Sequence, residues 1–298
     1  MNNYDDLLNN ASENTSAEQN GQLSKEDYAA KKQAERESLY TLSDIAALSV
    51  AGDGNQFQQF LDVQAKFSRY SAVNALLIYS QKPDATRLGG FELWKSNGGF
   101  IRSGQTGISI LEPGKEYDRE DGSTGVSYNV KKVFDASQVD TRKVRAIPQP
   151  QYDERQLLKA LISNATARIT GVDELPGDFG AMTDPETGEI CVRKGMAFAD
   201  TFRSTAQELA AAELAKSYDT QTEPAFSAYC ASYLVCEKHG VDTHDFDFSL
   251  TPATFDGMDA QEIKGELSQI RDAADNISGR MARALGAVDK PAINKEAR

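Results

Sequence analysis

Apolar residues recur at helical spacing along the first eighty positions. Those between residues 39 and 48 predict one side of a helix that begins at Ser24 and ends near Val50, before the glycines at 52 and 54. A second helix is expected to end at residue 81, with Ser71 as its N-cap and a proline just beyond its end. Between these helices the spacing continues through three phenylalanines, which we predict to be buried: Phe57, Phe60 and Phe67.

Alternating apolar and polar positions predict two strands in the middle of the chain. Ile108 and Ile110 alternate with polar residues up to Pro113, and a second alternation runs from Val126 to Phe134. The segment between the two strands is polar and turn-rich, so we expect it to be a loop or a hairpin tip. Its sequence is GKEYDREDGSTG.

Beyond Pro148 and Pro150, which mark the best candidate for a domain boundary, the pattern becomes mainly helical. The last amphipathic stretch is the most regular of the chain, and we favour its docking onto its own domain over self-association as a coiled coil. Two short strands are expected at 179–183 and 190–193. Helices are expected at 153–168, 200–218, 224–239 and 263–284.

Together these elements predict an α+β protein. A small domain of helices and an antiparallel sheet should be followed by a mainly helical domain. The predicted divisions are a disordered polar tail at 1–23, a helical extension at 24–55, a first domain at 56–147, a second domain at 153–255, and a C-terminal amphipathic helix with a tail at 256–298.

Charge distinguishes the first domain from the rest of the chain. The 298 residues carry a formal net charge of −13, yet residues 56–150 hold thirteen Lys and Arg against ten Asp and Glu. A polyanion would therefore be drawn to this segment and repelled elsewhere. No apolar run approaches the ~20 residues of a membrane span, and the three cysteines form no CxxC pair. We expect a cytoplasmic protein without a membrane contact, a disulfide framework, a zinc ribbon or a cofactor.

Aromatic and basic side chains of the first domain fit single-stranded nucleic acid. Unpaired bases stack on aromatic rings while cations follow the phosphates. Trp94 is either a stacking platform or a core residue, and Asn74 and Gln81 either touch bases or satisfy backbone groups. The candidate stacking platforms are Tyr70, Trp94 and Phe100, with exposure favoured for Tyr70 and Phe100. The candidate phosphate contacts are Lys66, Arg69, Lys82, Arg87, Lys95 and Arg102.

The same segment resembles a known family. The resemblance lies in Tyr70-Ser71, Asn74, Gln81, Gly90-Phe91, Trp94, Gly104, Gly107-Ile108, Val133-Phe134-Asp135 and Ser137-Gln138. These residues look like the N-terminal single-stranded-DNA-binding domain of ArdC-type antirestriction proteins. The second half, from GAMTDPETGEICVRKG to SAYCASYLVCEKHGVDTHDF, is similar to the zincin-like metallopeptidase domain that usually accompanies it. The resemblance implies a plasmid, phage or conjugative element as the source.

That resemblance also implies where a zinc site would lie. A zincin uses HExxH on one helix, so that two imidazoles bind the metal and the intervening Glu activates its water. Here Gln207 and Ala211 occupy the histidine positions, and Tyr229 occupies that of a third ligand from the next helix. Glu208, the would-be base, remains. We therefore expect a metal-free domain without protease activity.

Two functions follow as hypotheses. The first is a non-catalytic single-stranded-DNA-binding protein of a mobile genetic element, with a role in antirestriction or in protecting transferring DNA. The alternative is a protein-interaction module or decoy, in which the metal-free second domain binds a host or element-encoded protein and DNA binding is vestigial.

Overall fold

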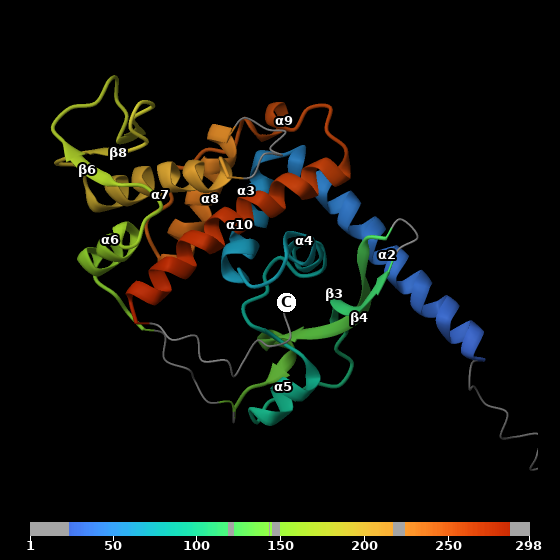
Figure 1. Cartoon of the computed structure of the whole chain (residues 1–298). Helices are drawn as coiled ribbons and strands as arrows, with labels where there is room; N and C mark the ends of the chain where they lie inside the picture. Colours follow the sequence, from blue (N-terminus) through green and yellow to red (C-terminus); the bar gives the residue numbers. More distant parts are fainter. Residues whose placement is uncertain (1–23, 119–121, 143, 145–149, 217–223, 287–298) are drawn as a thin grey trace, which may run out of the picture.

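The computed structural model describes residues 24–118, 122–142, 144, 150–216 and 224–286, and it is a mixed α+β fold as predicted (Figure 1). The first half contains α2 (Lys25–Ala51), α3 (Gly54–Lys66), α4 (Ala72–Gln81), β1 (Leu88–Gly89), α5 (Phe91–Ser96), β2 (Phe100–Ile101), β3 (Ile108–Asp118), β4 (Thr124–Asp135), the 3-10 turn η1 (Ala136–Gln138) and β5 (Val139–Asp140). The second half contains α6 (Glu154–Ile162), β6 (Ile169–Val172), β7 (Ala181–Thr183), β8 (Ile190–Arg193), α7 (Phe198–Leu214), α8 (Pro224–His239), α9 (Thr251–Thr254) and α10 (Ala260–Ala284). The predicted tail at 1–23 lies outside the described residues.

Polar caps set the ends of the first helices. The Ser71 side chain accepts a hydrogen bond from Asn74 N and begins α4, as predicted. Asp53, within the Gly-Asp-Gly break, caps α3 in the same way through Gln56 N. The three phenylalanines predicted to be buried are at most 9% exposed. Local sequence therefore fixes where α3 and α4 begin and which side chains they bury.

The base of the β3–β4 hairpin is enclosed by helices. Leu111 packs against Leu39 of α2 on one face. On the other face, Ile110 packs in a cluster with Phe67, from the end of α3, and Ile78 of α4. Since both faces of the hairpin base are covered, its strands are rich in buried residues up to Leu111 and largely exposed beyond.

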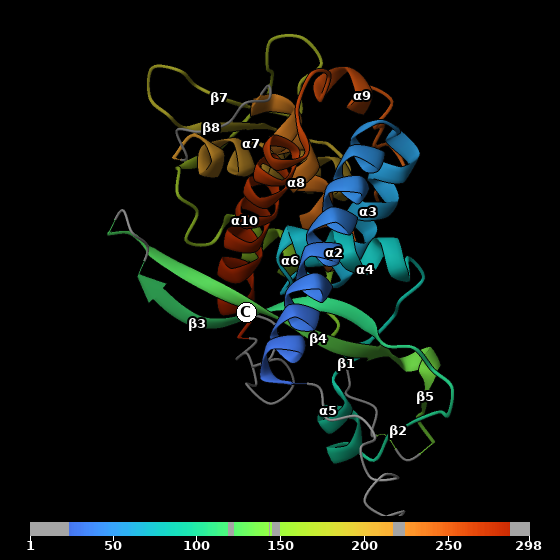
Figure 2. The ribbon, with the colours of Figure 1, turned by 90° about the vertical axis from the view of Figure 1, so that its right-hand side faces the viewer.

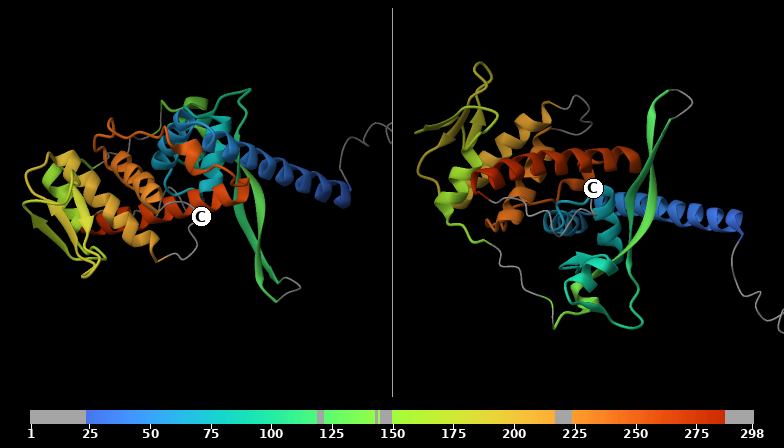
Figure 3. Two further views of the ribbon diagram at one scale, coloured as in Figure 1. Left: turned by 90° about the horizontal axis from the view of Figure 1, so that it is seen from above. Right: turned by 60° about the horizontal axis from the view of Figure 1, so that its bottom comes forward.

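Beyond this base the hairpin projects from the body as a long arm (Figures 2 and 3). The sequence predicted the two strands and a loop or hairpin tip over 114–125, and the structure has a hairpin there whose strands reach further into that segment than predicted. Glu116 pairs with Val126 and Tyr117 with Gly125, after a register shift that follows Pro113. The outer part of the strands gave no signal because its exposed faces need no apolar alternation, which is the pattern that reveals a half-buried strand.

A small three-stranded sheet lies beside α7 in the second half (Figure 1). Strand β8 is central, with β6 parallel on one side and β7 antiparallel on the other. The predicted bounds of β8 and α8 are confirmed, and those of α7 differ by a few residues. The helix expected at 153–168 is shorter, because Ile162 ends α6 and Asn164 adopts a left-handed φ of 54°. Strand β6 then begins at Ile169, directly after the residues predicted to be helical.

Helix α10 docks within its own chain, as we favoured over a coiled coil. Its apolar side is buried against α7 and α8, and it also contacts α2, α4 and α6 (Figure 1). Ion pairs lie near both ends of the helix: the buried Lys264 pairs with the partly exposed Asp44 of α2, and Arg280 pairs with Glu213 of α7 at 2.6 Å in a largely buried setting. The buried side-chain stripe comprises Ile263, Leu267, Ile270, Ala274, Ile277 and Met281, whereas Ala284 is exposed.

The main hydrophobic core crosses the predicted domain boundary. Phe57 of α3 lies 5.6–5.9 Å, between ring centroids, from three phenylalanines of the second half. Asp62, also on α3, accepts a hydrogen bond from the Tyr233 hydroxyl at 2.5 Å. One cluster of buried residues runs from α2 through α10. The first half is therefore built on a core that the second half completes.

Candidate nucleic-acid interface

A small lobe with an excess of basic residues lies beneath the hairpin and contains β1, α5, β2 and β5 (Figure 2), together with η1. We call residues 82–107 and 132–145 the basic lobe; all are described except 143 and 145. Their sequence holds eight Lys and Arg against four Asp and Glu, in a chain whose net charge is −13. Two of these carboxylates are paired within the lobe, Asp84 with Lys82 and Asp140 with Arg142. The lobe is thus electropositive on an acidic protein.

Trp94 is the centre of this lobe, not an exposed platform. The indole is 2% exposed, and its Nε1 donates a hydrogen bond to Phe134 O at 2.9 Å. A Cβ at position 89 would lie 3.0 Å from Nε1, and β1 therefore needs a glycine there for the indole to approach. The sequence left two interpretations of Trp94 open, and the structure shows it as a core residue. We therefore remove Trp94 from the candidate stacking platforms.

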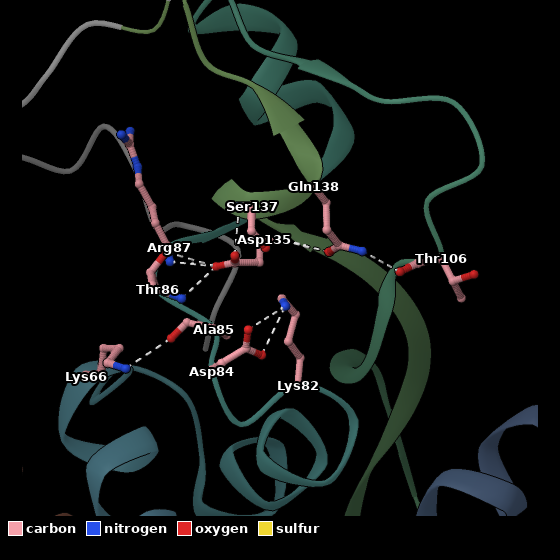
Figure 4. Close-up of polar contacts among 10 residues, drawn as sticks. All are labelled: Lys66, Lys82, Asp84, Ala85, Thr86, Arg87, Thr106, Asp135, Ser137 and Gln138. Carbon is pink, nitrogen blue, oxygen red and sulfur yellow. Dashed lines mark hydrogen bonds and ion pairs between the residues drawn. The ribbon is translucent and has the colours of Figure 1, made fainter.

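A buried carboxylate joins three segments of the lobe (Figure 4). Asp135 Oδ1 accepts hydrogen bonds from Thr86 N and Arg87 N at 2.6 and 2.9 Å, and Oδ2 accepts one from Ser137 N at 2.8 Å. Gln138 continues the network, because its Oε1 accepts from Asp135 N and its Nε2 donates to Thr106 O. The Asp135 network therefore positions the segments on which Arg87 and Arg102 lie.

The same bonds control the ionisation of Asp135. Burial raises its pKa, but hydrogen bonds from Ser137, Arg87 and Thr86 outweigh burial and lower the pKa to about 2. A carboxylate whose pKa is lower in the folded state stabilises the fold above its unfolded pKa. This contribution is lost as the pH falls from about 4 to about 2. Lowering the pKa of Asp135 from 3.8 to about 2 corresponds to a stabilisation of the folded state by about 2 kcal/mol at neutral pH.

We predict that Asp135→Asn lowers the free energy of unfolding by about 2–4 kcal/mol at pH 7, since the amide also turns an N–H towards donors. The deficit relative to the unmodified chain should shrink as the pH falls below 4. Urea denaturation at several pH values measures both effects. Asp140→Asn is the matched control: its pKa is also lowered to about 2, but by the exposed Arg142, so little stability should be lost. Equal costs for the two variants would contradict the assignment.

The predicted phosphate contacts fall into two groups. Lys66, Lys82 and Arg87 have structural partners: Lys66 Nζ donates to Ala85 O at 3.1 Å, Lys82 pairs with Asp84, and the Arg87 guanidinium lies 5.1 Å from the Trp94 ring centre. Lys66 and the Asp84 pair appear together in Figure 4, below the Asp135 network. Arg69 is exposed in the turn after α3 and has an interaction of its own. The other two candidates, Lys95 and Arg102, are exposed on the basic lobe.

Two exposed phenylalanines lie in the same short segments of the chain as these cations. Phe100 of β2 is 60% exposed, and Arg102 follows two positions later, held by hydrogen bonds to Ser137 O and Val139 O. Phe91 of α5 is 54% exposed, and the Lys95 ammonium lies 5.9 Å from its ring centre. Exposure of Phe100 agrees with the prediction. Phe91 was missed as a candidate, although its spacing of four residues from Lys95 on a short helix was a usable signal.

The expected exposure of Tyr70 is wrong. Its ring is 6% exposed and packs edge-on against Phe67, with 6.2 Å between ring centres. The turn position that favoured exposure instead directs the side chain inward, into the cluster beneath β3. Tyr70 therefore offers no face to a base in this structure.

Asn74 and Gln81 satisfy backbone groups, one of the two roles that the sequence left open. Asn74 receives a hydrogen bond from Leu111 N and donates one to Leu111 O, both at 2.8 Å. Gln81 does the same with Ser109 N and O, both at 2.9 Å. These side chains of α4 thereby pair the outer edge of β3 as a neighbouring strand would. Their amides are engaged with the protein itself.

The positions at which the sequence resemblance would place a zinc site hold groups unsuited to a metal. Glu208 accepts hydrogen bonds from Thr183 N and Thr183 Oγ1 at 2.9 and 2.6 Å. The Tyr229 hydroxyl accepts one from Asp247 N at 2.7 Å, and burial raises the pKa of this phenol, which keeps it protonated. Gln207 is a neutral amide, a poor ligand for zinc, and the Ala211 side chain has no atom that could bind a metal. Among the described residues, no three His, Cys, Asp or Glu side chains are grouped as a metal would require.

The fold and this site define an α+β protein whose first half carries a small electropositive lobe. Residues 49–153 match the family model of the N-terminal domain of anti-restriction factor ArdC. This segment contains the whole basic lobe, so the likeness to the ArdC N-terminal domain covers the candidate interface. No curated protein matches the chain. None of the helices within the described residues is long and apolar enough to cross a membrane.

Two solved structures are similar to this chain. Both are crystal structures of the antirestriction ArdC protein from plasmid R388. The metal-free form is 20% identical with a TM-score of 0.49, and the alignment covers 72% of this chain and 86% of that one. The Mn(II)-bound form is 18% identical with a TM-score of 0.48, and covers 72% and 85%.

Proposed function

We propose that this protein binds single-stranded DNA through the basic lobe and is a non-catalytic protein of a mobile genetic element. The observation that carries the proposal is that exposed rings and cations occur together: the Lys95 ammonium lies 5.9 Å from the ring centre of exposed Phe91, and exposed Arg102 lies two positions after exposed Phe100 in the chain. Both pairs lie on the electropositive lobe of an acidic chain. The match to the ArdC N-terminal domain supports a nucleic-acid partner and an antirestriction role.

The chemistry of the two pairs suits a strand whose bases are unpaired. An exposed aromatic ring stacks on any base and contributes about 1–3 kcal/mol per base. A neighbouring Arg or Lys neutralises a phosphate and releases a counterion. Duplex DNA presents its phosphates but keeps its bases stacked on each other, so it gains only the neutralisation of phosphates and no stacking on the rings. The lobe is therefore expected to prefer single strands.

We predict that Phe100→Ala in the full chain weakens binding to a single-stranded oligonucleotide by about tenfold, because one stacked base loses its platform. Fluorescence anisotropy with a labelled strand measures the change. Phe179→Ala is the matched control, since Phe179 is 61% exposed but lies in the acidic second half. Equal affinities for the two variants would contradict the interface.

A second expectation concerns metal. Because Gln207, Ala211 and Tyr229 replace the expected ligands, neither Zn²⁺ nor the Mn²⁺ found in one R388 ArdC structure should bind. A ligand that binds only the folded state raises its stability. We therefore predict no rise in melting temperature with either ion, and less than one metal per ten chains by elemental analysis. A stoichiometric ion that is lost in Glu208→Ala would overturn this part of the proposal.

The alternative function, capture of a protein partner by the second half, has less support. Strand β7 forms one edge of its sheet, where an added peptide strand would pair. Glu208 occupies Thr183 N on that strand and places a carboxylate at the edge. We accordingly place the partner at the basic lobe, and the protein in the cytoplasm where incoming single strands are found.

A further inference from the structure

A small cavity lies where α3, α8 and α10 meet. Its volume is about 10 Å³, and its lining includes Gln64 of α3, Leu234 of α8 and Ser278 of α10. A space of about 10–15 Å³, measured with a water-sized sphere, holds one water molecule. The cavity therefore has room for one water molecule and for nothing larger.

Two buried polar atoms on this lining lack a partner within the described part of the chain. Gln64 Nε2 donates to Tyr70 O at 3.3 Å, but Gln64 Oε1 accepts no hydrogen bond, and Ser278 Oγ makes none. Both residues are 2% exposed. Buried polar atoms are almost always hydrogen-bonded in native proteins. Two such atoms on one small cavity indicate a shared partner.

We infer that a single water molecule binds in this cavity and bridges Gln64 Oε1 and Ser278 Oγ. A water molecule donates two hydrogen bonds, which satisfies an amide oxygen and a hydroxyl oxygen together. Charged side chains also line the cavity: Lys238 and Asp275 are 3.7 Å apart, and Arg271 donates to Ser68 O.

The position of this water gives it a structural role. Gln64 belongs to the segment that matches the ArdC N-terminal domain, whereas Ser278 lies on the helix that docks against both halves. The bridge therefore links the two halves of the chain beside the direct hydrogen bond from Arg271 to Ser68 O. This inference is independent of DNA binding.

A high-resolution crystal structure of the full chain is the direct test. We expect ordered solvent within about 2.7–3.2 Å of both Gln64 Oε1 and Ser278 Oγ. A dry cavity, or a direct hydrogen bond between the two side chains, would overturn the inference.

Equilibrium unfolding of full-length variants gives a second test. Ser278→Ala should lower the unfolding stability constant at least about fivefold, because the water and Gln64 lose a partner. Ser268→Ala is the control on the same helix: its hydroxyl donates to Lys264 O within α10, so the change should stay within about twofold. If Ser278→Ala costs no more than Ser268→Ala, the bridge does not exist.

Discussion

A chain that ends at residue 150 is expected to lose cooperative folding altogether. Such a chain lacks the phenylalanines at 226, 248 and 255 that surround Phe57. It also lacks the Tyr233 hydroxyl, which donates a hydrogen bond to Asp62. Each large apolar side chain left exposed costs about 1.5–3 kcal/mol. The core of α3 alone contains Phe57, Phe60 and Leu61, all at most 1% exposed. Their combined loss rivals the 5–15 kcal/mol that stabilises a typical domain.

The single tryptophan gives a clean measurement of this effect. Trp94 reports on the basic lobe, while far-UV circular dichroism reports mainly on helices. In the full chain the two urea transitions should coincide. Phe57→Ala should shift both to lower urea by the same amount, for a loss of about 3–5 kcal/mol. If residues 1–150 retain a sigmoidal Trp94 transition, the first half folds alone and the shared core is not essential.

The second large effect is expected from reversing the charges beside the exposed rings. Lys95→Glu combined with Arg102→Glu should weaken single-strand binding about a hundredfold or more, since each charge-assisted contact contributes about 1.5–3 kcal/mol. The slope of log K against log salt should fall by about 1.4, because two counterions fewer are released. The control is Arg155→Glu with Lys159→Glu, two exposed cations on α6 outside the lobe. A similar loss in both double variants would mean that net charge, not the lobe, governs binding.

Local signals predicted much of the fold. Ser71 and Pro83 bracket α4, because caps and helix-ending prolines are local properties of the sequence, and the predicted bounds of α8 are those observed. The small elements of the basic lobe were not predicted. Strands β1, β2 and β5 have two residues each, too few for any alternation to appear. They exist because their partners lie far along the chain: β1 pairs with β4, and β2 pairs with β5.

The candidate site shows the same division. Sequence identified Phe100, Lys95 and Arg102 by residue type, and the structure leaves all three exposed. It could not decide the environment of Trp94, because the carbonyl that the indole meets belongs to Phe134, forty positions away. Tyr70 was misjudged for a similar reason: its turn faces the inner side of a hairpin formed later in the chain. Residue type predicts chemistry, but burial depends on distant partners.

The central claim is that the basic lobe binds unpaired strands. The most direct measurement is a salt titration of the full-length protein against labelled single-stranded and duplex DNA of equal length, followed by fluorescence anisotropy. The account predicts tighter binding to the single strand at every salt concentration, with affinity that falls as salt rises. Equal affinity for both forms, or no single-strand binding at about 50 mM salt, where even non-specific contacts register at about 10⁻⁴–10⁻⁶ M or tighter, would contradict it.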